Sequence, residues 1–364
     1  MATGGYPSFS DRELRRRHEA LAEVMDAHGV EHVLVRGANR VGTAVGWLTR
    51  WPVTQQAVVV VTPGRPDALL VGFYNHVPNA VRIATGCDVR WVGERPLETA
   101  LDEVRARGGG RLGFIGPPVP DAVDLNGEYA RLRLVKSAEE IEWIRRAAAL
   151  TDAGVAALRE AARPGVDERA LCAAIEAAYL PAGAVNHIHY LAATPMAAPE
   201  ICVPAQYPSD RPLAAGDALV CEVSAAFWEY PAQLLRTFAV AAEPAPLYAE
   251  LHAVADAAFD AIAARLRPGA TAADLAAAGG VIVDAGFAIR DDLVHGFVGG
   301  YLPPVIGART AVPDFTFAAG MTVVVQPNVV TPDERAGVQT GELLLVGEDG
   351  AERLHGFERG LLAA

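Results

Sequence analysis

The chain has 364 residues, of which 51% are hydrophobic and 21% are charged, a composition typical of a globular protein. This length favours two domains over one. The formal net charge is −13, from 31 basic and 44 acidic residues, and such a chain repels phosphate backbones and anionic lipids. We therefore expect a small molecule or a peptide as ligand, with no nucleic-acid partner and no membrane partner.

Targeting and redox signals are weak. The first ten residues carry no basic stretch followed by an apolar run, so a secretory signal is not visible. Charged residues and Pro268 interrupt the alanine-rich stretch 251–287, which excludes a membrane span there. The four cysteines lie far apart without a CxxC pair. The sequence therefore predicts a reduced, cytoplasmic protein.

The first third of the chain alternates helical and strand patterns. Ser10 and Glu13 form a capping box for a helix that ends near His28. A second helical pattern covers 97–107. Short apolar runs predict strands at 32–35, 57–61, 68–72, 89–92 and 112–115. This alternation predicts a first α/β domain over residues 1–132.

A second domain, predicted over 133–364, begins with another capping box. Ser137 and Glu140 start a long helix over 139–162. The turn Arg163-Pro164-Gly165 ends that helix and precedes another one.

The second domain contains an internal duplication. The turn Arg267-Pro268-Gly269 lies 104 residues after the equivalent turn Arg163-Pro164-Gly165 and again separates two alanine-rich helices. At the same offset, the apolar strand after Gly216 matches the one after Gly320. Two such copies predict a pseudo-twofold axis within the domain.

Polar residues occupy equivalent places in the two copies. Glu222 and Gln326 each end an apolar strand that should be buried, and buried polar groups need partners. Chain order places four more polar residues near them: Gln233, Arg236, His295 and Gln339. The cluster is either an active site on the symmetry axis or a structural network of hydrogen bonds.

At these residues the chain resembles the creatinase, aminopeptidase P and methionine aminopeptidase family, over roughly 132–354. The residues that carry the resemblance are Lys136, Glu140, Ile141, both Arg-Pro-Gly turns, Gly216-Asp217, Tyr230, Arg236-Thr237, His295-Gly296, Gly320-Met321, Gln326-Pro327 and the segment 337–350. The resemblance implies an α/β (α+β) pita-bread domain with pseudo-twofold duplication. It also implies a smaller creatinase-type domain before it, with Trp47-Leu48-Thr49 in a loop.

Metallopeptidases of that family hold two divalent ions with two aspartates, one histidine and two glutamates. The matching positions here are Glu222, Gln233, His295, Gln326 and Gly341. A further family histidine falls at Ala205, after Pro204. Two adjacent cations need bridging anionic oxygens, which amides and a glycine do not supply. The sequence therefore predicts no metal and no cofactor.

Creatinase is the family precedent for hydrolysis of a C–N bond without a metal, although Leu235 and Ala205 replace two creatinase residues here. The sequence thus predicts a metal-independent hydrolase of a C–N bond (amide, urea, lactam or amidine-like) in a small nitrogen-containing molecule. Three alternatives stay open: a peptide-binding or ligand-binding protein without turnover, a mononuclear-metal Xaa-Pro-type peptidase, and a lyase.

Glu222 and His295 are the predicted acid–base pair, because a buried glutamate beside a histidine can exchange protons near neutrality. A core hydrogen bond between them is the alternative. His187 and His189 stand two apart, so a strand would point both to one face, where they would replace the missing histidine. With Glu222 they could instead hold a single metal ion.

The predicted substrate-binding residues are mostly neutral. Gln233, Gln326 and Gln339 would orient an uncharged amide-like group. Arg236 would bind an acidic substrate or pair with Glu222, Tyr230 would stabilise an oxyanion, and Tyr301 would form a pocket wall. The resemblance also implies a homodimer in which residues 73–76 of one subunit close the pocket of the other.

Overall fold

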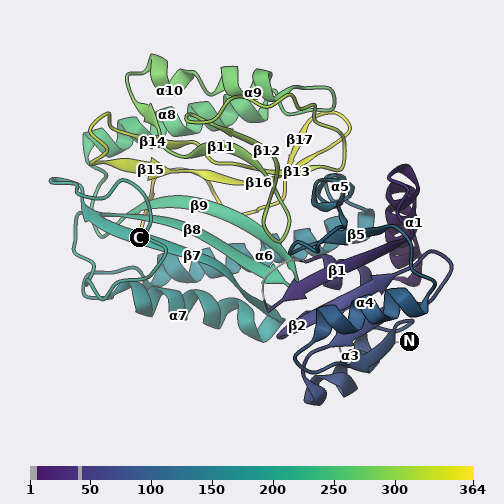
Figure 1. Ribbon diagram of the computed structural model, residues 1–364. Coiled ribbons are helices and arrows are strands. Elements are labelled where there is room, and N and C mark those ends of the chain that lie inside the picture. The colour runs from purple at the N-terminus through teal and green to yellow at the C-terminus, as the bar shows by residue number, and fades with distance from the viewer. Residues whose placement is uncertain (1–5, 40–42) are drawn as a thin grey trace. The chain divides into compact units, whose positions relative to one another are not determined.

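The computed structural model describes residues 6–39 and 43–364. The chain splits into two compact units, Met1–Arg133 and Leu134–Ala364. Each unit has its own sheet and its own hydrophobic core (Figure 1). Within the described ranges, no helix combines the length and the apolar character needed to cross a bilayer.

The first unit is an α/β layer built, in the described part, on a six-stranded sheet in the order β4-β3-β2-β1-β5-β6. Its strands are β1 (His32–Ala38), β2 (Gln56–Val61), β3 (Ala68–Val71), β4 (Asp88–Trp91), β5 (Leu112–Ile115) and β6 (Val123–Asp124). Its helices are α1 (Asp11–Ala27), α2 (Ala44–Thr49), η1 (Tyr74–His76), α3 (Val77–Ile83), α4 (Pro96–Ala106) and α5 (Asn126–Leu132). The helices cover both faces, because α4 packs on one face while α1, α2 and α3 pack on the other.

One local expectation for this unit is wrong. Trp47, Leu48 and Thr49 were expected in a loop, yet they form the end of α2, with every residue of that helix buried. The helix stops at Arg50, whose backbone is left-handed (φ 66°). The buried Trp47 and Leu48 side chains belong to the core beside α1, and this packing favours a helix over an exposed loop.

The second unit contains, in the described residues, a curved, almost wholly antiparallel nine-stranded sheet whose main path runs β12-β11-β13-β16-β9-β8-β7, and a three-stranded sheet in the order β10-β14-β15. The first-half elements are α6 (Ala138–Ala161), α7 (Glu168–Tyr179), η2 (Leu180–Ala182), β7 (Ala184–Pro195), β8 (Asp217–Phe227) and β9 (Tyr230–Ala239). The second-half elements are α8 (Pro246–Ala263), α9 (Ala272–Ala278), α10 (Val281–Asp284), β10 (Ala288–Ile289), β11 (Asp292–Phe297), β12 (Tyr301–Gly307), β13 (Thr322–Val325), β14 (Asn328–Val330), β15 (Gly337–Gln339), β16 (Gly341–Val346), β17 (Ala351–Arg353) and β18 (Leu362–Ala363).

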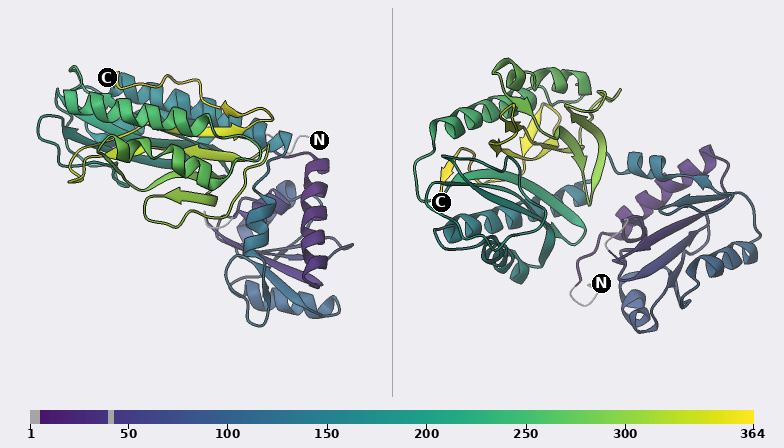
Figure 2. Two further views of the ribbon diagram at one scale, coloured as in Figure 1. Left: turned by 90° about the horizontal axis from the view of Figure 1, so that it is seen from above. Right: turned by 60° about the vertical axis from the view of Figure 1, so that its left-hand side comes forward.

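The two halves of this unit repeat one arrangement. Helices α6 and α7 cover the outer side of β7 to β9, and α8 to α10 cover the outer side of the other half (Figures 1 and 2). At an offset of 104 residues, α6 matches α8, α7 matches α9 and β8 matches β13. The sheet is continuous across the junction, because β16 pairs with β9.

Local chemistry explains where the repeated helices begin and end. Ser137 and Glu140 form the capping box at the start of α6. Gly165 and Gly269 follow the two prolines with positive φ values of 90° and 84°, which a side chain would strain. The two equivalent Pro-Gly turns therefore reverse the chain in the same way in both halves.

Candidate functional site

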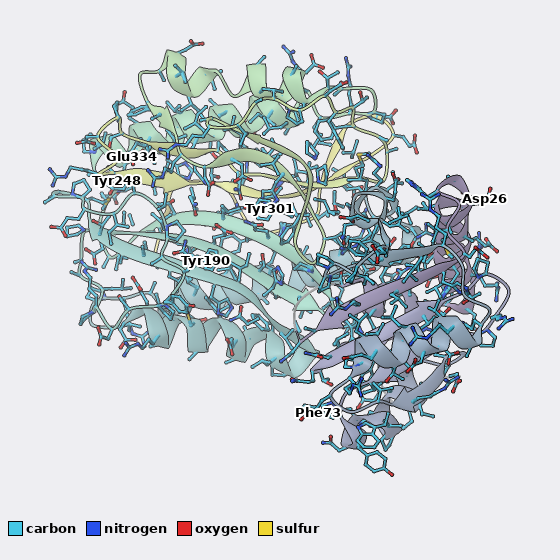
Figure 3. The ribbon with its side chains drawn as sticks, in the orientation of Figure 1. Asp26, Phe73, Tyr190, Tyr248, Tyr301 and Glu334 are labelled. Atoms are coloured by element: carbon cyan, nitrogen blue, oxygen red, sulfur yellow. The ribbon has the colours of Figure 1, made fainter. Side chains whose placement is uncertain are left out.

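One cavity of about 340 Å³ lies in the second unit between its two halves. We call it the Glu222 cavity. The residues that line it are Tyr190, Val203, Pro204, Gln206, Glu222, Arg290, Asp291, Tyr301, Arg309, Gln326 and Gln339. Tyr190 comes from β7 and Tyr301 from β12, the two edge strands of the main sheet path (Figure 3). The cavity therefore uses both copies of the duplicated unit, as a site on the pseudo-twofold axis should.

A chain of side-chain hydrogen bonds forms the inner wall. The Gln233 Nε2 amide donates to Glu222 Oε1 at 2.7 Å and to Gln326 Oε1 at 3.1 Å. Strand pairing explains the meeting: Glu222 lies opposite Leu235 and Ser224 lies opposite Gln233, so Glu222 and Gln233 share one face of the sheet. The two residues at equivalent positions, Glu222 and Gln326, are thus joined through a third.

His295 lies on β11 and its side chain is fully buried. Its ring stacks on Tyr301 at 4.0 Å between centroids, and its Nδ1 lies 3.2 Å from the carbonyl of Gly296. Its Nε2 atom lies 3.8 Å from Asp292 Oδ2. No hydrogen bond between His295 and Glu222 occurs in the described residues. Instead, Gln233 contacts both Glu222 and Gln326, and the Gln326 side chain interacts with His295.

Burial is the largest cause of the pKa shifts of Glu222, Asp292 and His295. It raises the pKa of Glu222 to about 8, with the charges of Asp292 and Asp291 adding to the effect. It raises the pKa of Asp292 to about 7 in the same way, again with Asp291 nearby. It lowers the pKa of His295 to about 4, so this ring is neutral at pH 7. Burial thus shifts the pKa values of Glu222 and His295 in opposite directions, which does not favour the predicted proton exchange between them near neutrality.

Gly341 occupies a place where no side chain fits. A Cβ atom on it would lie 2.5 Å from the Val325 carbonyl oxygen and 2.8 Å from Gln326 Cα. The backbone of β16 therefore approaches the end of β13 more closely than a glutamate at 341 would allow. The packing of the sheet therefore leaves no room for a carboxylate side chain at position 341.

The two histidines of β7 do not share a face. His189 is hydrogen bonded to Tyr179 of α7 at 2.9 Å, on the helix side of the sheet. A bulge between Asn186 and Ile188 interrupts the alternation, and the His187 ring instead packs edge-on against Phe297, 5.7 Å between centroids. The prediction that both would replace a missing site histidine is wrong for His189, and a metal site built from both with Glu222 does not form.

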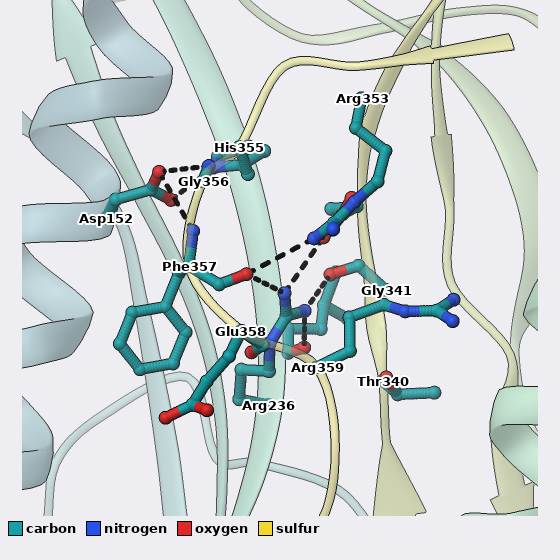
Figure 4. A network of polar contacts seen from close by, with 12 residues as sticks. Asp152, Arg236, Thr340, Gly341, Arg353, His355, Gly356, Phe357, Glu358 and Arg359 are labelled. Atoms are coloured by element: carbon teal, nitrogen blue, oxygen red, sulfur yellow. Dashed lines mark hydrogen bonds and ion pairs between the residues drawn. The ribbon is translucent and has the colours of Figure 1, made fainter.

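Arg236 and Tyr230 also point away from the Glu222 cavity. Arg236 is fully buried and donates to Glu342 and to four backbone carbonyl oxygens (Figure 4). Tyr230 donates to Glu140 of α6 at 2.9 Å. Both residues lie three positions from Gln233 on β9, and residues an odd number apart face opposite sides of a strand. Their predicted roles in substrate binding are corrected to structural ones.

The structure adds residues that the sequence did not single out. Asp292 is 5% exposed, Asp291 lines the cavity, and Tyr190 stands opposite Glu222 in the pairing of β7 and β8. The only signal in the sequence was the acidic pair 291–292 ahead of an apolar run. A bulge between Asp292 and Val294 brings this carboxyl to the side of His295, and alternation along a strand does not predict that.

The duplicated helix–sheet unit, with polar residues gathered where its two copies meet, defines a pita-bread protein. The chain belongs to metallopeptidase family M24, whose model matches residues 142–348. Of the named relatives, Probable dipeptidase PepE of Mycobacterium tuberculosis is 31% identical over 231 residues, 61% of this chain and 58% of its own length. The Xaa-Pro dipeptidase of Pyrococcus furiosus is 28% identical over 236 residues, 64% of this chain and 66% of its own length.

Similarity of fold extends over both units. The crystal structure of dipeptidase PepE from Mycobacterium ulcerans is similar to this chain, with a TM-score of 0.81 and 22% identity. The match covers 98% of this chain and 99% of the PepE chain. The predicted pita-bread fold is thereby confirmed. The mycobacterial sequence relative matches this chain over 58% of its own length, so its activity does not pass directly to this chain.

The predicted metal-independent, creatinase-like hydrolase is wrong. The relatives are named dipeptidases, and the family is one of metallopeptidases. Peptides, rather than ureas, lactams or amidines, are therefore the ligand class that the relationship supports.

The residues of this chain do not fit the metal centre that the family name implies. Of the five matching positions, Gln233 and Gln326 are neutral amides and Gly341 has no side chain. The Gln233 amide nitrogen, a donor, lies between two oxygens of the wall, whereas a cation needs converging acceptors. Over residues 6–39 and 43–364, no three His, Cys, Asp or Glu side chains converge to hold an ion.

Proposed function

We propose that the second unit recognises short peptides of about dipeptide size in the Glu222 cavity, without a two-metal centre. The observation that carries the proposal is the wall Glu222–Gln233–Gln326, in which hydrogen-bonded amides stand where the family places anionic metal ligands. Amide side chains supply both donors and acceptors, so Gln326 and Gln339 can pair with the peptide group of a ligand. The names of the relatives supply the ligand class.

The charges around the cavity support a zwitterionic ligand. Glu222 and Asp291 place negative charge on its lining, while Arg290 and Arg309 place positive charge there. Both arginines also contact Glu334, an exposed acid (Figure 3). A free short peptide carries one ammonium and one carboxylate group, which complement these two kinds of lining residue.

Calorimetric titration with a panel of Xaa-Pro and Xaa-Ala dipeptides is expected to show saturable binding of one ligand per chain. Tyr301→Ala should weaken it by about tenfold, because Tyr301 forms one wall and stacks on His295. Tyr6→Ala, at an exposed tyrosine of the first unit outside the segment 73–76, is the matched control and should leave the affinity unchanged. Absence of binding by every dipeptide of the panel would refute the proposal.

Hydrolysis of the bound peptide is the second candidate function. It is favoured by the names of the relatives, which are dipeptidases, and by the family, which is one of metallopeptidases. Mass spectrometry of the same dipeptides, incubated with the protein in the presence and absence of Mn²⁺, separates the two functions. Free amino acids would establish hydrolysis, and intact dipeptides would establish binding alone.

Metal retention tests the absence of the two-metal centre. Protein incubated with Mn²⁺ and then desalted is expected to keep well below one ion per chain by elemental analysis, because three of the five ligand positions carry no charge. A Gln233→Asp, Gln326→Glu double variant restores two carboxylates beside Glu222 and should keep more Mn²⁺ than the wild type. Two ions per chain in the wild type would contradict the expectation.

The homodimer, the closure of one pocket by residues 73–76 of another subunit, and the cytoplasmic location stay predictions.

A further inference from the structure

Among the described residues, Asp292 is a buried acid without an arginine or lysine partner. It is 5% exposed, and its Oδ2 atom has no hydrogen-bond partner among the residues that the structure describes. The basic side chain within ion-pair distance is His295, 3.8 Å away, which burial keeps neutral at pH 7. A buried carboxyl in this state is costly unless a partner arrives.

Two other buried acids of the chain, Glu342 and Asp217, are paired with arginines. Glu342 is fully buried and contacts both Arg236 and Arg353. Asp217 is 1% exposed and accepts two hydrogen bonds from Arg211, at 2.7 and 2.9 Å. Glu222, in contrast, accepts one hydrogen bond from the neutral Gln233 amide and forms no ion pair within the described ranges. Among the described residues, Glu222 and Asp292 thus differ from Glu342 and Asp217 in having no arginine or lysine as an ion-pair partner.

More acceptors near these acids are also unused. The Oε1 atoms of Gln233 and Gln339 are buried and without a hydrogen-bond partner in the part of the chain that is described. Gln233 contacts Glu222 directly, and Gln339 lines the same cavity. The acceptors come from β8, β9, β11 and β15, so they approach one region from separate strands. Burial, together with the charges of neighbouring carboxylates, raises the pKa values of both Glu222 and Asp292.

We propose that Glu222 and Asp292 bind the free α-ammonium group of the peptide, which fixes the ligand with its N-terminus at the inner end of the cavity. The inference rests on the proposed function. A primary ammonium has three N–H donors and a compact charge, which suits two carboxylates and a neutral amide oxygen on different strands. A planar guanidinium needs a parallel pair of acceptors instead, and the cluster lacks the three converging ligands of a metal ion.

N-acetylation of the ligand removes the charge that the two acids would bind. The tightest-binding dipeptide of the panel and its N-acetyl derivative are titrated into the wild-type protein. The free dipeptide should bind at least about tenfold more tightly, because it alone makes charge-assisted hydrogen bonds to the carboxylates. Nα-acetyl-Lys-Ala tests a side-chain ammonium as the alternative source of the charge and should bind as weakly as the other acetylated ligand.

Asp292→Asn tests the residue itself. It should weaken binding of the free dipeptide by about tenfold and leave binding of the acetylated one unchanged, whereas general damage to the fold would weaken both. Asp349→Asn, in the exposed turn before β17, is the matched control and should change neither. Glu222→Gln is a second variant with the same expected pattern, and thermal melting shows that each variant is folded.

The outcomes separate the inference from the proposed function. Equal affinity for the free and acetylated dipeptides, an Asp292→Asn variant that binds the free dipeptide as the wild type does, or tight binding of Nα-acetyl-Lys-Ala would overturn the ammonium site while leaving peptide recognition in place. Absence of binding by every dipeptide would overturn both.

Discussion

Arg236→Ala is expected to lower the free energy of unfolding by about 3–5 kcal/mol, the cost of leaving a buried charge without its partner. Arg236 and Glu342 are both fully buried and lie 2.8 Å apart. The guanidinium also holds the carbonyl oxygens of Gly341, Phe357 and Glu358, so it ties the C-terminal segment to β9 and β16 (Figure 4). Urea unfolding followed by circular dichroism at pH 7 measures the change.

Arg353→Ala is the matched control for this substitution. Arg353 contacts the same Glu342 but its side chain is 47% exposed, so its loss should cost only about 1 kcal/mol. The folded fraction of Arg236→Ala should bind dipeptides as the wild type does, because Arg236 faces away from the Glu222 cavity. A loss of stability below about 1 kcal/mol for Arg236→Ala, or a selective loss of binding, would refute the structural role.

Glu222→Gln is expected to become more stable than the wild type as the pH rises. In the folded chain burial raises the pKa of Glu222 to about 8 from 4.5, so the folded state holds this proton more tightly than the unfolded state does. Below about pH 4.5 the residue is protonated in both states and the variant and wild type should be equally stable. Between about pH 4.5 and 8 the wild type progressively loses stability, and above 8 the loss is complete.

The gap at pH 9 should exceed about 2 kcal/mol in favour of the variant, since one pKa unit corresponds to about 1.4 kcal/mol and Glu222 retains some contact with solvent. Asp292 and Asp291, the charged neighbours of Glu222, are present in both proteins, and removal of the Glu222 charge also eases ionisation of Asp292. Glu348→Gln, in an exposed turn, is the matched control for the exchange of a carboxyl for an amide. Urea unfolding of all three proteins from pH 4.5 to 9 checks the expectation, and a gap for Glu222→Gln that is constant or shrinks with pH would contradict it.

The alternation of side chains along β9 shows how much of the site could be predicted from the sequence. Gln233 was expected at the site and contacts Glu222 there. Arg236 and Tyr230 were grouped with it by chain order alone, although an odd separation on a strand already places them on the opposite face. Strict application of the two-residue period would have separated cavity residues from structural ones on this strand.

On β7 and β11 the two-residue alternation of side chains does not predict which face a residue occupies. Bulges between Asn186 and Ile188 and between Asp292 and Val294 shift the alternation, which redirects His187 and places Asp292 beside His295. A bulge depends on pairing with the neighbouring strand, so a single strand's sequence does not reveal it. This is why the two histidines were misplaced and Asp292 was missed.

The sequence by itself determined the duplicated second domain, the capping boxes, the Pro-Gly turns and the loss of anionic residues at the family's metal positions, because these follow from residue identity and local spacing. Only the tertiary structure decided that Gly341 leaves no room for a side chain, that Arg236 binds the C-terminal segment, and that Asp292 lies beside His295 and near Glu222. Those facts depend on distances between strands far apart in the chain, and such distances are set by packing rather than by local propensity.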